Sequence, residues 1–179
     1  MAELHLQEGA FDEAATGVEA IVHTASPVSL DAGDPDELIV PAVKGTVGIL
    51  HSASRSATVR RVVLLSSCAA VVDPHATGPR VYDETCWNEV DVEEVKTKGR
   101  DAPQLSKYRA SKTFAERKAW EYYAQAQAKG ERWDFVVINP PWVFGPVMHE
   151  LKGGPETLND SNKSWYDAVI KGEFNRALE

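Results

Sequence analysis

The sequence predicts an α/β fold in which helices flank a parallel sheet. Three short runs rich in valine, isoleucine and leucine are typical of buried strands, at 18–25, 61–67 and 134–140. Segments with helical periodicity fall between and after these strands, at about 35–56, 106–129 and 164–178. This alternation indicates parallel pairing with right-handed crossovers. Since no repeat or linker interrupts the order, we expect one domain over residues 1–179.

A short helix is predicted ahead of the first strand, over residues 10–17. Gly17 ends it, because glycine accepts the left-handed conformation that closes many helices. The strand that follows stops before Pro27, since proline cannot donate a hydrogen bond to a sheet.

The helix after the first strand begins with a capping pattern. Asp34 is predicted to be its N-cap, with Pro35 at the first helical position and Glu37 three residues after the cap. Apolar residues then recur at helical spacing to about Ser56.

The middle of the chain predicts a long excursion away from the sheet. Residues 73–106 are rich in acids and show no clear period, and long loops in compact domains are often functional. We interpret the acidic run Asp91–Glu94 as a solvent-exposed face. A long helix then extends to Lys129 and is closed by Gly130. The last helix of the chain is weakened by Gly172.

Composition and charge exclude several classes of protein. The formal net charge is −8, from 27 acidic and 19 basic residues without any basic block, which argues against a nucleic-acid partner. No apolar run reaches the ~18–20 residues that span a bilayer, and the acidic N-terminus lacks the apolar core of a signal peptide. We therefore expect a cytoplasmic protein that does not bind membranes, in which Cys68 and Cys86 are reduced thiols. The five histidines show no metal-ligand spacing, so we expect no metal site.

Small polar residues and prolines gather where the three predicted strands end. The segments are HTASP (23–27), SSC (66–68) and NPPWVFGP (139–146). Ligands of open α/β sheets bind at the carboxyl ends of the strands. The sequence therefore predicts a binding site at this end of the sheet.

Tyr108 and Lys112 stand four residues apart in a predicted helix, so they share one face of it. A nearby cation lowers the pKa of a tyrosine, which suits general acid–base catalysis. Ser67 ends the preceding strand, where its hydroxyl is placed to donate to a carbonyl oxygen beside Tyr108. Each feature alone fits a surface pair or a turn-forming serine, but together they favour a catalytic role.

Six segments, taken in order, resemble a known enzyme family. They are HTASPV (23–28), PAVKGTVGIL (41–50), RVVLLSSCAAV (61–71), YDETCWNE (82–89), YRASKTFAERKAWE (108–121) and VVINPPWVFGP (136–146). They resemble the extended short-chain dehydrogenases of the NAD-dependent epimerase/dehydratase superfamily. The likeness is to the dihydroflavonol 4-reductase and cinnamoyl-CoA reductase branch, above all to fungal carbonyl reductases of the yeast methylglyoxal reductase type. It covers about residues 9–170.

This resemblance implies a Rossmann-like, doubly wound fold and an oxidoreductase that uses NADP, with NAD as the alternative. The substrate would be a small molecule with a carbonyl group, an aldehyde or a ketone, reduced by hydride transfer. Ser67 would orient the carbonyl, Tyr108 would protonate its oxygen, and Lys112 would hold the nicotinamide ribose and lower the pKa of Tyr108. The residues implied along the cofactor are Tyr108, Lys112, Thr24, Ala25, Ser26, Pro140 and Val143.

Two other functions stay open at this point. Sugar-nucleotide epimerases and dehydratases of the same superfamily share the Ser, Tyr and Lys residues, although the ASPV and DETCWNE segments favour the reductases. A non-catalytic protein that only binds a partner is the third alternative, and it is favoured by a missing motif described next.

The missing motif is the Gly-rich turn that binds the dinucleotide pyrophosphate in such families. No G-x-G-x-x-G pattern can be drawn through the 12 glycines. We therefore expect a partial Rossmann-like sheet that lacks the family's first strands, in a chain truncated at both ends. The strand over 18–25 would then expose a bare apolar edge through which the chain self-associates. We also expect marginal stability and weak NADPH binding.

Overall fold

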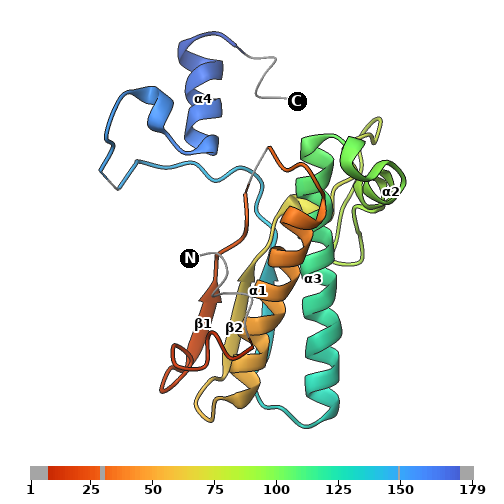
Figure 1. Ribbon diagram of the computed structural model, residues 1–179, viewed down its shortest axis with the longest axis vertical. Helices are drawn as coiled ribbons and strands as arrows, with labels where there is room; N and C mark the ends of the chain where they lie inside the picture. The colour runs from red at the N-terminus through yellow and green to blue at the C-terminus, as the bar shows by residue number, and fades with distance from the viewer. Residues whose placement is uncertain (1–7, 29–30, 149, 174–179) are drawn as a thin grey trace. The chain divides into compact units, whose positions relative to one another are not determined.

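Three strands pair in parallel in the computed structural model, in the order β1-β2-β3 (Figure 1). They are β1 Ala20–His23, β2 Arg61–Leu65 and β3 Asp134–Ile138. The structure describes residues 8–28, 31–148 and 150–173. The predicted α/β fold with a parallel sheet is confirmed, although each strand is shorter than predicted. Pairing stops where the chain leaves the sheet toward the polar segments at the strand ends.

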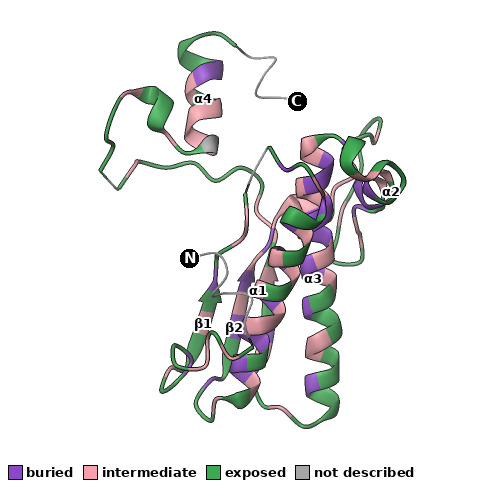
Figure 2. Ribbon diagram, viewed as in Figure 1, coloured by how far each residue is buried: buried purple, intermediate pink, exposed green. Residues whose placement is uncertain are grey.

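Two long helices cover one face of the sheet. They are α1 Asp36–Arg55 and α3 Gln104–Ala128, which pack against each other (Figures 1 and 2). The buried core that they share with the sheet comprises Ile49, Leu50, Ala53, Val59, Val62, Leu64, Ala119, Ala126, Trp133 and Phe135. Alternate strand residues thus enter the core, as expected of a sheet covered on that face.

The start of α1 confirms the predicted capping pattern, shifted by one residue. The Asp34 carboxylate accepts from the Asp36 backbone N–H (3.1 Å), and the Glu37 carboxylate reaches back to the Asp34 N–H (3.1 Å). Two amide groups that the helix leaves without a partner are satisfied in this way.

The predicted helix over 10–17 is wrong, because residues 8–17 form a series of turns. The segment is too short to offset the unfavourable free energy of helix nucleation by itself. It also lies between two glycines with left-handed backbones, Gly9 (φ 79°) and Gly17 (φ 74°). Asp12 ties these turns to α1, since its carboxylate accepts from Ser52 Oγ (2.5 Å) and Arg55 Nη1 (3.0 Å).

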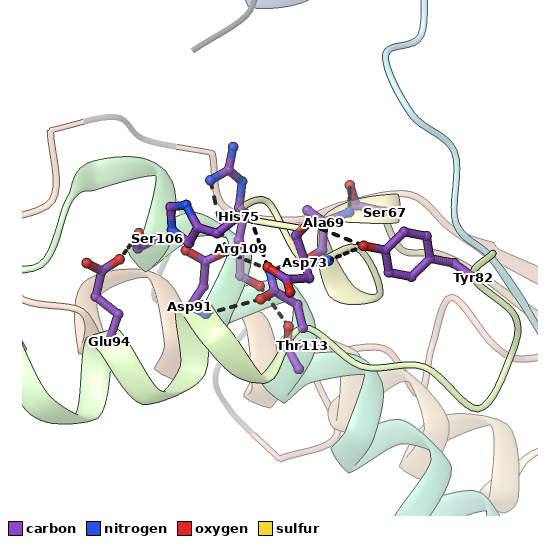
Figure 3. Close-up of polar contacts among 11 residues, drawn as sticks. Ser67, Ala69, Asp73, His75, Tyr82, Asp91, Glu94, Ser106, Arg109 and Thr113 are labelled. Carbon is purple, nitrogen blue, oxygen red and sulfur yellow. Dashed lines mark hydrogen bonds and ion pairs between the residues drawn. The ribbon is translucent and has the colours of Figure 1, made fainter. Parts of the chain in front are cut away.

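The excursion over 73–106 contains a helix that the sequence did not predict, α2 Glu89–Lys98, followed by the short η3 Gly99–Asp101. The interpretation of Asp91–Glu94 as a solvent-exposed face is also wrong, since Asp91 is 0% exposed. Its carboxylate accepts from Asn88 Nδ2 (2.6 Å). The same carboxylate lies 4.0 Å from the Arg109 guanidinium of α3 (Figure 3). Both partners meet Oδ2, whereas Oδ1 has no hydrogen-bond partner within the described residues, so burial of the carboxylate is compensated only in part.

Asn88 joins α2 to the turn that follows β2, which makes it a sensitive position. It caps α2 by accepting from the Asp91 N–H (3.1 Å) and donates to the Ala69 carbonyl (3.0 Å). We predict that Asn88→Ala lowers the free energy of unfolding by about 2 kcal/mol, because a cap and two buried hydrogen bonds are lost. Urea denaturation would measure this change. Glu93→Gln, on the exposed side of α2, is the control, and an equal effect of both substitutions would contradict the prediction.

Residues 1–140 and 141–179 form two separate compact units, and the elements above belong to the first. In the second unit, Trp142 and Phe144 stack with nearly parallel rings, 6.2 Å between centroids. Its helix is α4 Asp160–Ile170, preceded by the short η4 Pro155–Thr157. The predicted helix over 164–178 therefore begins too late, and the left-handed Gly172 (φ 75°) closes it early. The part of that prediction over 174–178 lies outside the described residues, and the single domain over 1–179 stays a prediction.

The outer strand β1 and the sheet face opposite the helices expose apolar side chains. Val22 is 66% exposed, and Val136 and Ile138 of β3 are exposed as well. Self-association through this sheet stays a prediction, which light scattering over a concentration series would test. We expect the apparent mass to rise toward two chains, and Val22→Lys to keep it at one, because an edge lysine blocks strand pairing. A mass of one chain at every concentration would contradict this.

No helix in the described part of the chain is both long and apolar enough to cross a membrane.

Candidate active site

Tyr108 and Lys112 occupy successive turns of α3, on one face of the helix, as predicted. The Lys112 ammonium lies over the Tyr108 ring, 5.8 Å from its centroid. Tyr108 is half-buried and Lys112 is buried. The Ser111 hydroxyl donates to the Tyr108 carbonyl (2.7 Å), so its hydrogen-bond partner lies within the same helix.

Ser67 is the second residue after β2, and it meets Tyr108. Its hydroxyl oxygen accepts from the Ala69 N–H (3.1 Å), which caps the short helix η2 Cys68–Ala70 (Figure 3). The same side chain makes a hydrogen bond with the side chain of Tyr108. The structure thus brings together the three residues that the sequence selected: Ser67, Tyr108 and Lys112.

The pKa of Tyr108 is raised from its ordinary value of 10.0, chiefly by burial of the phenol. The hydrogen bond with Ser67 acts in the opposite direction, and the Cys68 thiol nearby adds to the increase. The prediction that Lys112 lowers the pKa of Tyr108 is therefore wrong in this structure. Burial dominates, and the ammonium lies over the ring face. The phenol is consequently protonated at neutral pH, as a proton donor must be.

The pKa of Lys112 is lowered to about 8, because burial disfavours its charged form. The negative charge of Glu116, one turn further along α3, opposes this decrease. At neutral pH the ammonium therefore keeps its charge in a poorly solvated position.

The predicted cofactor residues are only partly brought together. Ala25 and Ser26, just after β1, line a hollow with Lys112. Thr24 lies exposed at the same strand end, and the Pro140 carbonyl, after β3, accepts from the Cys68 N–H (3.0 Å). Val143 belongs to the second compact unit, so its place along the cofactor stays a prediction.

Sequence reasoning missed two residues of this site, Glu116 and Asn139. Glu116 is only 5% exposed, and its carboxylate accepts from Ser66 Oγ (2.6 Å) and Asn139 Nδ2 (2.7 Å). A signal for Glu116 was available, since it continues the four-residue spacing of Tyr108 and Lys112 along one helix face. Asn139 shows no such signal, because its partners are distant in sequence.

Both cysteines are free thiols and line one cavity of about 320 Å³ beside the site. In the part of the chain that the structure describes, no group of three or more His, Cys, Asp or Glu side chains could hold a metal ion.

The parallel α/β sheet and the Ser, Tyr and Lys residues gathered at the ends of its strands define a protein of the short-chain dehydrogenase class. Comparison with known proteins agrees. The model of the NAD-binding family described as "Male sterility protein" matches residues 1–175, and the chain belongs to this family.

Named relatives are reductases. A ketoreductase, azaE, of Aspergillus niger is 41% identical over 169 residues, which are 92% of this chain and 47% of the relative. A dihydroflavonol 4-reductase of Medicago sativa is 35% identical over 94% of this chain and 75% of the relative. The crystal structure of yeast methylglyoxal/isovaleraldehyde reductase Gre2 complexed with NADPH superimposes with a TM-score of 0.69 at 34% identity. The superposition covers 81% of this chain and 43% of Gre2. The chain spans about half the length of most curated relatives that it matches.

Proposed function

We propose that this chain carries the catalytic centre of an NADPH-dependent carbonyl reductase in the cytoplasm, which converts an aldehyde or a ketone to an alcohol. One observation carries the proposal: the side chains of Ser67 and Tyr108 are hydrogen-bonded, with Lys112 one helical turn away. The family of NAD-binding proteins, the ketoreductase and dihydroflavonol 4-reductase relatives, and the NADPH complex of Gre2 support it.

The residues present fit the nicotinamide half of such a cofactor. Lys112 presents a buried ammonium to the hollow that Ala25 and Ser26 also line. A buried ammonium needs oxygen acceptors, and the hydroxyls of a ribose are such acceptors. The sequence holds no Gly-rich turn for the pyrophosphate, so the fit concerns the nicotinamide and its ribose alone.

When bound, NADPH supplies the hydride that reaches the carbonyl carbon. The Ser67 hydroxyl donates a hydrogen bond to the carbonyl oxygen and fixes its direction. The Tyr108 hydroxyl gives its proton to that oxygen as the new C–H bond forms, so that the alcohol leaves neutral. The resulting phenolate recovers its proton from water.

The experiment follows deuterium from NADPH labelled at carbon 4 of the nicotinamide to a panel of small aldehydes and ketones. We expect one deuterium on the carbinol carbon of the product and one NADP⁺ for each alcohol. Deuterium kept by the cofactor, with conversion of a sugar nucleotide, would favour an epimerase or dehydratase instead. A folded protein that transfers no deuterium to any carbonyl would overturn the proposal in favour of a partner-binding role.

A further inference from the structure

Glu116 continues the row of site residues along α3. Tyr108, Lys112 and Glu116 follow one another at intervals of four residues, so all three lie on one face of the helix. A buried carboxylate is stable only when donors or charges compensate for its lost hydration. The groups that compensate for the buried charge of Glu116 connect this residue to the strand ends beside Ser67 and to Lys112.

The first connection runs to the strand ends. Ser66 Oγ donates to the Glu116 carboxylate (2.6 Å), and Ser66 itself is the residue before Ser67. Asn139 Nδ2 donates to the same carboxylate oxygen (2.7 Å) and also to the Ser67 carbonyl (3.0 Å). The backbone of Ser67 is thus fastened to α3 by Glu116, two turns beyond the Tyr108 that Ser67 must meet.

The second connection is electrostatic and runs to Lys112. The charge of Glu116 raises the pKa of Lys112 against the larger effect of burial. The other residues that face Lys112 across the hollow come from the segment after β1, from α1 and from the end of β2. They are Ala25, Ser26, Thr46, Leu64, Leu65 and Ser66, none of which titrates. Tyr108 and Glu116 are therefore the titratable groups beside this ammonium within the described residues.

We propose that Glu116 is a positioning residue, which holds Ser67 in register with Tyr108 through Ser66 and Asn139 and places a negative charge beside the Lys112 ammonium. This inference rests on the proposed reduction, in which Ser67 and Tyr108 share one carbonyl oxygen. The hydrogen bonds of Glu116 run to Ser66 and Asn139, so it acts on Ser67 through these two residues.

The test uses two substitutions in the full chain that separate charge from geometry. Glu116→Gln keeps an oxygen acceptor for Ser66 and Asn139 but removes the charge. We expect the pKa of Lys112 to fall by about 1 unit, and the alkaline limb of the pH profile of kcat to move down with it. The pKa of Lys112 is read by NMR after ¹³C-methylation of the lysines. Glu121→Gln, at an exposed carboxylate on the same helix, is the control and should change neither quantity.

Asn139→Ala keeps the charge of Glu116 but cuts the link to the Ser67 carbonyl. We expect kcat to fall at least about tenfold, because misplacement of Ser67 affects the transition state, while KM for NADPH and the pKa of Lys112 stay unchanged. Either expected change supports the proposal, and the absence of both overturns it. If Glu116→Gln does not fold, kcat of Asn139→Ala decides alone. If the wild-type protein shows no turnover, the proposed function is wrong. The pKa of Lys112 in Glu116→Gln would still show whether Glu116 acts on this lysine.

Discussion

Tyr108→Phe is expected to lower kcat for carbonyl reduction by about 10³-fold, which makes it the substitution with the largest effect on activity. The variant loses the hydroxyl that donates the proton and that bonds with Ser67, while the ring that packs under the Lys112 ammonium remains. Because burial raises the pKa of Tyr108, its hydroxyl carries the proton throughout the neutral range. Steady-state oxidation of NADPH with a reducible aldehyde measures the effect.

A second tyrosine on the same helix provides the matched control. The Tyr122 hydroxyl bonds with Ser54 Oγ (3.1 Å), away from the strand ends, so Tyr122→Phe should leave kcat within about twofold. Affinity for NADPH should be similar in both variants, which shows that the site is still folded. If Tyr108→Phe kept more than a tenth of the wild-type kcat, the proton would have to come from another group and the proposed role of Tyr108 would be lost.

The grouping of Ser67, Tyr108 and Lys112 was predictable because these residues follow local rules. Ser67 was recognised from its place at a strand end, and Tyr108 and Lys112 from their spacing in a helix. Both rules concern neighbours along the chain, and the structure meets both.

What the sequence could not reveal depends on contacts between distant residues. Asp91 is hydrophilic by type, yet it is buried against Asn88 and Arg109. Because α2 buries this acid beside Val92 and Val95, its buried face does not read as an apolar stripe in the sequence. Asn139 gains its role from Glu116, 23 residues away, and from Ser67, 72 residues away. The direction of the pKa shift of Tyr108 likewise follows from burial, which spacing alone does not show.

Lys112→Met is expected to stabilise the fold at pH 7 while it abolishes reduction. The pKa of Lys112 is about 8 in the folded chain, against an ordinary value of 10.5. At about 1.4 kcal/mol per unit, the buried ammonium destabilises the fold by about 3 kcal/mol, a figure that is good to order of magnitude. Methionine preserves an unbranched apolar side chain and removes the charge, so we expect a gain of about 2 kcal/mol in the free energy of unfolding.

The pH dependence of this gain has a definite sign. Below pH 8 the lysine is protonated in both states, so the destabilisation of the wild type is complete. Between pH 8 and 10.5 the unfolded chain binds the proton more tightly than the folded one, and the wild type becomes more stable as pH rises. The advantage of Lys112→Met should therefore be full at pH 7 and shrink steadily toward pH 10. Denaturant unfolding at these two values measures it.

Lys107 provides the control, since it is also buried on the same helix but has acceptors. Its ammonium donates to the carbonyls of Ala32 (2.8 Å) and Gly33 (3.1 Å). Lys107→Met should therefore destabilise the chain by about 1–3 kcal/mol, because two buried carbonyls lose a charged donor. If both substitutions destabilised the chain alike at pH 7, the Lys112 ammonium would be as well satisfied as that of Lys107. A site that binds the hydroxyls of a cofactor should instead leave Lys112 with few acceptors while the cofactor is absent. The unbound protein is then less stable, and cofactor binding restores the lost stability.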